Sequence, residues 1–304
     1  MGKYLSCCKK EIEDTSGGFA EGEAEISFPE YQSTSDEYFT LIENKYNLFK
    51  DIQIVEYMNL LESFSIQTAT TKFEGTYRYD FKSTDEFLNT TFHQDEFQSF
   101  IENKLLNIPE ILELYGEDDQ TIALFKEIFL KIFSALNVRL NSFYKDDTDN
   151  KNKITKLNLI PFGILFCRSK NVSKMKLFFE LFQNEENYFI KSDKLNNYLI
   201  TSFFISSYCL VSVRSLIDNK EQNLEKIDKR EIQMLLTDKG LVQKNCENLL
   251  KYFNDNFFDK KDKLNWEEFK KKFTCDDSEE NSFAWIFSTQ GIRNKLESKN
   301  IMNL

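Results

Sequence analysis

The sequence Y-F-N-D-N-F-F-D-K-K-D-K-L, residues 252–264, decides the expected fold because its pattern recurs along the chain. Apolar residues at helical spacing lead into a polar loop, the loop ends in Leu264, and Phe269 opens a second helix. Three earlier stretches have the same order: F-Y-K-D-D-T-D-N-K-N-K-I, L-F-Q-N-E-E-N-Y-F-I and L-I-D-N-K-E-Q-N-L-E-K-I. The loop-ending residues stand at 154, 190, 227 and 264, at intervals of 36, 37 and 37 residues. This spacing predicts an internal repeat of helix, polar loop and helix.

The rest of the chain also predicts helices, so the expected fold class is all-α. Gly and Pro are scarce, with 9 and 3 residues, whereas Phe occurs 30 times. Apolar residues recur at steps of three or four through residues 36–64, 97–108 and 118–144. We expect a flexible tether over 1–35, a small helical module over 36–115 with no assignable chemistry, a four-repeat domain over 118–275 and a C-terminal docking helix within 278–304. The apolar run from Tyr198 to Val213 is shorter than a membrane span and is predicted to be a buried helix.

The order of helix, polar loop, apolar bridge residue and helix resembles the EF-hand (calmodulin) superfamily. With the N-terminal motif described below, the layout is similar to the myristoylated neuronal calcium sensors and calcineurin B. The resemblance implies four hands in two pairs, in which the residue at loop position 8 forms a short β-bridge with its counterpart. It therefore implies that Ile154 lies opposite Ile190 and that Ile227 lies opposite Leu264.

The first two loops depart from the calcium-binding pattern. Calcium takes six to eight oxygen ligands, and a twelve-residue loop supplies a bidentate Glu at its last position. The first loop offers Asp147 and Asp149 but ends in Asn158, and the second loop ends in Lys194. An amide and an ammonium cannot replace the chelating carboxylate, so we expect little binding here.

The third and fourth loops retain more carboxylates and look like two-residue expansions of the standard loop. Each begins with Asp-Asn and ends with Glu, and the fourth offers the best candidate site. We expect at most one weak calcium site. The candidate ligands are Asp218 and Glu231 in the third loop, and Asp255, Asp259, Asp262 and Glu268 in the fourth.

The chain begins M-G-K-Y-L-S-C-C, which fits the pattern for N-myristoylation of Gly2, with Cys7 and Cys8 as palmitoylation candidates. One acyl chain holds a membrane only marginally, so stable anchoring needs a second signal. The following residues are mostly acidic, and an acidic segment is repelled by anionic lipid. The second signal is therefore expected to be acyl chains on the two cysteines. We expect a peripheral, lipid-anchored protein on the cytosolic face of a plasma or ciliary membrane.

Charge and motifs argue against several other functions. A net charge of −11 makes nucleic acid an improbable partner, and neither nucleotide-binding glycine motif is present. The only histidine, His93, has no Cys or His beside it, and Cys209 lies in an apolar run, so we expect no enzyme and no cofactor other than weakly bound calcium. The C-terminal Phe283, Trp285 and Phe287 are too apolar for a free tail and are expected to dock in the protein's own groove or on a partner.

These features predict a membrane-anchored adaptor or scaffold that binds a protein partner through an apolar helical groove, with weak or no calcium binding. One alternative is a calcium sensor or regulatory subunit that switches through the third and fourth hands. Another is a structural component of a cytoskeletal or ciliary assembly.

Overall fold

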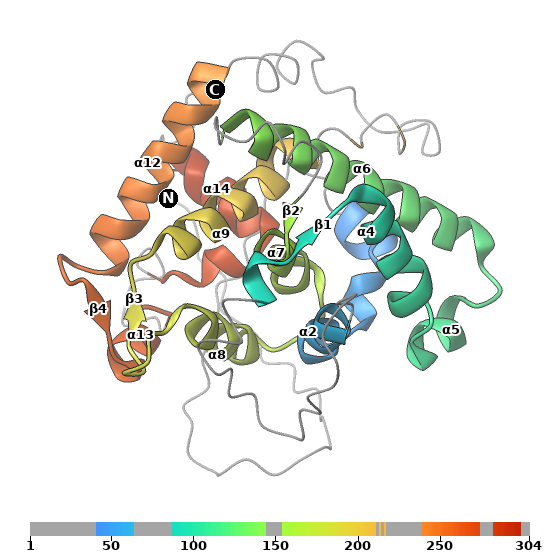
Figure 1. Ribbon diagram of the computed structural model, residues 1–304, viewed down its shortest axis with the longest axis horizontal. Coiled ribbons are helices and arrows are strands. Elements are labelled where there is room, and N and C mark those ends of the chain that lie inside the picture. The colour runs from blue at the N-terminus through green and yellow to red at the C-terminus, as the bar shows by residue number, and fades with distance from the viewer. Residues whose placement is uncertain are drawn as a thin grey trace, which may run out of the picture.

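The computed structural model confirms a predominantly helical fold (Figure 1). It describes residues 41–63, 87–143, 154–210, 239–273 and 282–298, together with Val213 and Leu216. The tether with Gly2, Cys7 and Cys8 lies outside these residues, as do the first and third loops before their bridge residues. The elements in chain order are η1 (Leu41–Lys45), η2 (Leu48–Asp51), α2 (Ile54–Ser63), β1 (Thr91–Phe92), α4 (Gln94–Phe100), η3 (Ile101–Leu105), α5 (Pro109–Tyr115), α6 (Asp119–Phe143), β2 (Ile154–Thr155), α7 (Lys156–Phe166), α8 (Asn171–Phe182), β3 (Phe189–Ile190), α9 (Asp193–Phe204), η4 (Ile205–Cys209), α12 (Lys239–Phe257), β4 (Lys263–Leu264), α13 (Trp266–Lys271), η7 (Ala284–Phe287) and α14 (Thr289–Ser298).

Helix α7 lies at the centre of the molecule (Figure 1). Its sequence K-L-N-L-I-P-F-G-I-L-F is apolar around the whole circumference, and all 11 residues are buried. A helix that is hydrophobic on every side belongs in the interior, which explains why it has no solvent face. The other helices are arranged around this hub.

Helix α2 approaches α7 closely because α7 carries Gly163 at the crossing. A Cβ atom at this position would lie 2.5 Å from Cδ1 of Tyr57, closer than any real contact allows. The Tyr57 hydroxyl also donates a hydrogen bond of 2.9 Å to the carbonyl oxygen of Leu159. The small residue and this buried hydrogen bond together fix the position of α2.

Two short antiparallel ladders correct the predicted pairing of the loops. Ile154 of β2 lies opposite Phe92 of β1, and Leu264 of β4 lies opposite Phe189 of β3. The predicted bridge between Ile154 and Ile190 is therefore wrong, and Leu264 does not have the expected partner; Ile227 lies outside the described residues. The first ladder joins the first predicted loop to a strand from the 36–115 segment, and the second ladder joins the second predicted loop to the fourth.

The second ladder is the centre of an aromatic cluster. The ring of Phe189 lies 4.7 Å from Phe269, 5.3 Å from Phe178 and 5.5 Å from Phe257, measured between centroids. These rings come from β3, α13, α8 and α12. Pairing β3 with β4 therefore brings four elements together around one buried side chain.

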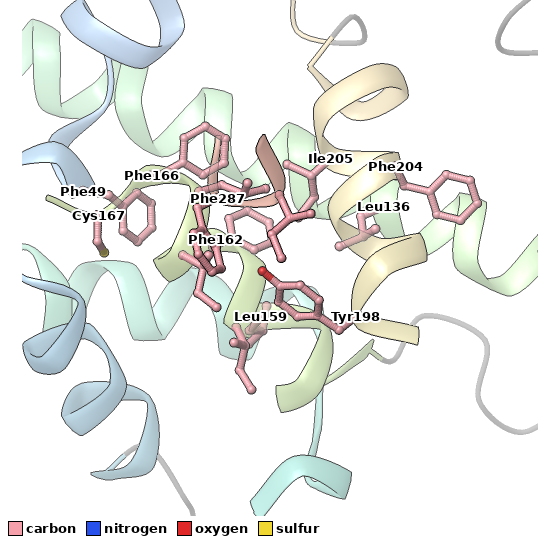
Figure 2. Close-up of a cluster of buried hydrophobic side chains, with 14 of the residues drawn as sticks. Phe49, Leu136, Leu159, Phe162, Phe166, Cys167, Tyr198, Phe204, Ile205 and Phe287 are labelled. Atoms are coloured by element: carbon pink, nitrogen blue, oxygen red, sulfur yellow. The ribbon is translucent and has the colours of Figure 1, made fainter. Parts of the chain in front are cut away.

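One contiguous hydrophobic core extends from Ile42 to Leu296. Figure 2 shows its middle, where side chains of η2, α6, α7, α9, η4 and η7 meet, with Phe162, Ile205 and Phe287 among them. The run from Tyr198 to Leu210 is a buried helix, as predicted, and continues from α9 into the π-helical η4. The helix expected over 118–144 is α6.

Candidate functional site: the paired loops

Three of the four helices that follow a bridge residue have the same arrangement at their first turn. In α4, α7 and α13 the cap residue follows the bridge residue directly, and the residue three positions later completes a capping box. These boxes satisfy backbone N–H groups that an isolated helix start leaves unpaired. The box residues are His93 and Glu96, Thr155 and Asn158, and Asn265 and Glu268. The last residue of each box occupies the position of the chelating Glu in a calcium-binding loop.

In the first pair, Asn158 connects its loop to a neighbouring helix. Its Oδ1 accepts hydrogen bonds from the Thr155 backbone N–H at 3.0 Å and from the Thr155 hydroxyl at 2.8 Å. Its Nδ2 donates to Oδ1 of Asn197 at 2.9 Å and to the Thr201 hydroxyl at 2.8 Å. Because Asn158 is buried and uses both ends of its amide, it joins α7 to α9 and has no free oxygen for a metal.

In the fourth loop, Glu268 is already neutralised by a lysine of the same loop. Its Oε1 lies 2.6 Å from Nζ of Lys261, and its Oε2 accepts a hydrogen bond from the Asn265 backbone N–H at 3.1 Å. The hydrogen bond with Lys261 and the one from Asn265 hold the pKa of the Glu268 carboxyl below its ordinary value. The ammonium group thus contacts the oxygen that a calcium ion would need.

The other predicted ligands of the fourth loop are not gathered around Glu268. Asp255 lies within α12, and the side chain of Asp262 is 98% exposed, with Oδ1 3.8 Å from Nζ of Lys191. Asp259 has a φ of 50° and helps to turn the loop. In a twelve-residue loop that ends at Glu268, the first ligand position falls on the buried Phe257. Among the described residues, no group of three or more His, Cys, Asp or Glu side chains is arranged to hold a metal.

The β3 loop is closed by its own backbone and by Asn184. The Asn184 N–H donates to the Tyr188 carbonyl oxygen at 2.8 Å, and its Oδ1 accepts from the backbone N–H of Glu186 and of Tyr188. Across the ladder, Nζ of Lys263 lies 3.0 Å from Oε2 of Glu186. Hydrogen bonds and the exposed ion pair between Lys263 and Glu186 therefore shape this loop.

The C-terminal segment docks on its own chain. Phe283, Trp285 and Phe287 are 5%, 2% and 3% exposed. Phe283 lies 5.0 Å from Phe257, and Phe287 lies 5.2 Å from Phe273, measured between ring centroids. Of the two expected destinations for this segment, the protein's own groove is the one occupied, and these three aromatic side chains are not presented to solvent.

Polar contacts also hold the C-terminal segment against the core. Arg293 of α14 donates a hydrogen bond of 3.3 Å to the carbonyl oxygen of Ser206, and its Nη2 lies 4.0 Å from Oε1 of Glu43. However, the indole N–H of Trp285 and the hydroxyl of Thr289 are buried without a hydrogen-bond partner. Each such group costs roughly 1–3 kcal/mol relative to a hydrated one. Docking of the segment is therefore driven by its apolar side chains and opposed by part of its polar surface.

Two features of this site were not predicted from the sequence, although one of them has a recognisable sequence pattern. Phe92 is followed five residues later by the buried Phe97, which is the spacing that identified the other repeats. Phe92 is aromatic rather than branched, so it does not match the bridge residue of the predicted repeat. The contacts of Asn158 with Asn197 and Thr201 had no signal in the sequence, because they join side chains about 40 residues apart only after folding.

Several predicted site residues lie outside the described part of the chain. They are Asp147 and Asp149 of the first loop, Asp218 and Glu231 of the third loop, and the acylation candidates Gly2, Cys7 and Cys8. Their roles stay predictions. Among the helices that the structure describes, none is both long and apolar enough to cross a membrane.

No protein-family model, curated protein or solved structure matches this chain.

Proposed function

We propose that this protein is a lipid-anchored, non-enzymatic helical adaptor built on the EF-hand plan, whose loops hold their shape without calcium. The contact between Lys261 and Glu268 carries the proposal. The fourth loop has the most candidate ligands, and the ammonium group of Lys261 already neutralises the Glu268 carboxylate at its end. A calcium ion would have to displace this ammonium and would still meet Phe257 at the first loop position.

The pairing of loops supports the EF-hand part of this proposal. Two antiparallel ladders each join a pair of loops, and a helix follows every one of these strands. In the first pair, Asn158 stands at the position of the chelating Glu, and its amide connects the loop end to α9 through hydrogen bonds. Such loops serve as fixed packing units rather than as switches.

Calorimetric titration of the full chain with calcium tests the loop assignment, including the third loop. We expect either no heat or one weak site in the range of about 10⁻⁴–10⁻³ M. The melting temperature should be the same in calcium and in magnesium. Tight binding at two or more sites would replace the adaptor assignment with that of a calcium sensor.

Fractionation of cells that express Gly2→Ala tests the membrane anchor. One myristoyl chain brings the cysteines to the membrane, so we expect this variant to move to the soluble fraction. Gly17→Ala in the same predicted tether is the matched control and should stay with the membrane. Membrane retention of Gly2→Ala would remove the lipid anchor from the proposed function.

A partner of this adaptor must either displace the C-terminal segment or bind elsewhere. The apolar face expected to receive the partner is covered by Phe283, Trp285 and Phe287 of the same chain.

A further inference from the structure

The turn between α7 and α8 lies in a basic stretch of this otherwise acidic chain. Residues 150–179 contain seven Lys or Arg residues and no Asp or Glu, whereas the whole chain has a net charge of −11. Arg168 and Lys170 are exposed at the turn itself. Figure 1 shows α8 at the lower edge of the ribbon, between β3 and α2. Positive charge of this kind attracts anions, but exposed basic residues alone do not define a binding site.

Neighbouring elements hold the turn in a fixed shape. The Ser169 hydroxyl accepts a hydrogen bond of 2.9 Å from the N–H of Ile54, at the start of α2. The side-chain amide of the buried Asn47 donates a hydrogen bond of 3.0 Å to the carbonyl oxygen of Phe166. These contacts join the turn to residues 115 and 119 positions away along the chain. A site on this turn is therefore preorganised, which lowers the entropy lost when a ligand binds.

The first turn of α8 leaves two backbone N–H groups available to a ligand. The cap residue Lys170 makes no side-chain hydrogen bond at the helix start, and the first turn has no acidic residue. The N–H groups of Ser173 and Lys174 both donate to the Lys170 carbonyl oxygen, at 2.9 and 3.2 Å. The N–H groups of Asn171 and Val172 precede these bonds, and no residue in the described part of the chain accepts a hydrogen bond from them. The helix start therefore presents two donors to an anion.

Lys174 adds a buried positive charge beside these donors. It is 7% exposed and is the fourth residue of α8. Helical side chains lean toward the N-terminus of their helix, so this one runs back along the first turn. Its ammonium group interacts electrostatically with Cys167, the residue at which α7 ends, and this places the charge beside the turn. Among the residues that the structure describes, none forms a hydrogen bond or an ion pair with this ammonium.

The carboxylates near the turn do not balance this charge. Glu43 acts electrostatically on Lys174, but its Oε1 also lies 4.0 Å from Nη2 of Arg293. Glu56 acts on Cys167. Burial lowers the pKa of Lys174 to about 8, although Cys167 and Glu43 oppose the shift. A buried ammonium with too little opposing charge is unfavourable, and a bound anion would supply the missing negative charge.

We propose that the turn between α7 and α8 binds a phosphomonoester group, the doubly charged phosphate of phosphorylated small molecules and of phosphoinositide headgroups. Its oxygens accept hydrogen bonds from the N–H groups of Asn171 and Val172, and the Lys174 ammonium neutralises their charge. The positive end of the α8 dipole adds to this preference. Arg168 and Lys170, exposed at the edge of the site, attract the ligand from solution. This inference depends neither on the lipid anchor nor on the calcium properties of the loops.

Calorimetric titration of the full chain with inositol 1,4,5-trisphosphate, a soluble molecule that carries phosphomonoester groups, tests the site. Lys174→Met should weaken binding by about tenfold or more, because it removes the buried charge and keeps a side chain of similar length. The matched control is Lys156→Met. Lys156 is also buried, and burial also lowers its pKa to about 8, but it stands at the opposite end of α7. Binding by the control should be unchanged, and equal losses in the two variants would overturn the proposal.

Asn171→Pro separates hydrogen bonding from charge. Proline is tolerated at the first position of a helix, where it removes only the N–H group. Lys170 already has a φ of −59° and a ψ of 142°, which suits the residue before a proline. Far-ultraviolet circular dichroism should show that the helix is retained, while binding of the trisphosphate weakens by about threefold to tenfold. Unchanged binding would show that the helix start does not hold the ligand and would overturn the proposal.

Flotation of vesicles distinguishes the two sources of the phosphate group. The full chain without acyl groups is mixed with phosphatidylcholine vesicles that contain phosphatidylinositol 4,5-bisphosphate. The control vesicles have equal surface charge from phosphatidylserine, which has no phosphomonoester. Binding to the phosphoinositide vesicles that is lost in Lys174→Met would identify a lipid headgroup, whereas binding of the soluble trisphosphate alone would identify a free phosphorylated ligand. Equal binding to the phosphatidylserine vesicles, or no binding of any of these probes, would overturn the proposal.

Discussion

The two loop pairs use the same sequence position in opposite ways. In the first pair, the last residue of the loop is Asn158, which is 4% exposed and hydrogen-bonded to α9. In the second pair, the equivalent Glu268 is partly exposed, and its carboxylate contacts Lys261 in its own loop. The first residue connects distant elements, whereas the second organises only its own turn. The comparison teaches that a position recognised by its spacing has an energetic role set by its surroundings.

The largest expected effect belongs to the aromatic centre of the second pair. Phe189→Ala removes a fully buried ring that contacts rings of α8, α12 and α13, so it should lower the free energy of unfolding by about 3–5 kcal/mol. Urea unfolding measures this loss. The exposed Val138→Ala should change stability by less than about 0.5 kcal/mol. A loss for Phe189→Ala of under about 2 kcal/mol would mean that the β3–β4 ladder is not a packing centre.

The next effect concerns the connection between α7 and α9. Asn158→Ala leaves Asn197 and Thr201 without this partner, so we expect unfolding to become easier by about 2–3 kcal/mol. The control is Asn103→Ala, which removes an exposed amide that donates one hydrogen bond to Ser99. That variant should cost less than about 0.5 kcal/mol. Similar losses in the two variants would show that Asn158 acts only as a local cap.

The third prediction concerns pH and the lysine that follows β2. Burial lowers the pKa of Lys156 to about 8, and the charge of Glu62 only partly opposes this shift. The unfolded chain therefore holds the proton more tightly than the folded one, and this lysine becomes less destabilising as pH rises from about 8 toward its ordinary pKa.

Substitution of Lys156 isolates this contribution from other titrating groups. We expect Lys156→Met to melt at a higher temperature than the wild type at pH 7, by an amount that shrinks at pH 9. Thermal unfolding at the two pH values provides the measurement. A difference between the proteins that grows with pH would contradict the assignment of a buried, proton-releasing amine.

The smallest expected effect is at the exposed end of the second pair. Glu268→Gln keeps an oxygen for the Asn265 N–H and loses only the exposed ion pair with Lys261, so the melting temperature should not change measurably. The calorimetric calcium titration should also be unchanged. Loss of a calcium-binding heat in this variant would show that Glu268 binds the ion after displacing Lys261.

Much of the local structure followed from sequence periodicity, but one repeat escaped it. The buried faces of α2, α4 and α6 match the predicted helical faces, because apolar residues at steps of three or four define one side of a helix. The strand at Phe92 lay in a segment to which no role could be assigned. Its bridge residue is aromatic, and its distance from Ile154 differs from the repeat interval.

The candidate site was predictable only in part. The sequence predicted that Asn158 lacks the chelating carboxylate, because this depends only on which residue type occupies the last loop position. It could not show that Lys261 contacts Glu268, because two side chains of opposite charge in one loop can also both face solvent.

Sequence alone was sufficient for the features that depend on neighbours along the chain: helical faces, the order of helix, loop and helix around β3 and β4, and the residue types at each loop end. The tertiary structure decided which loops pair, where the C-terminal aromatic residues dock and which side chains lie beside the turn between α7 and α8. These outcomes depend on the burial of apolar area shared among distant segments and on the close approach that Gly163 permits. Such energies belong to the assembled core and are not encoded by any single stretch of residues.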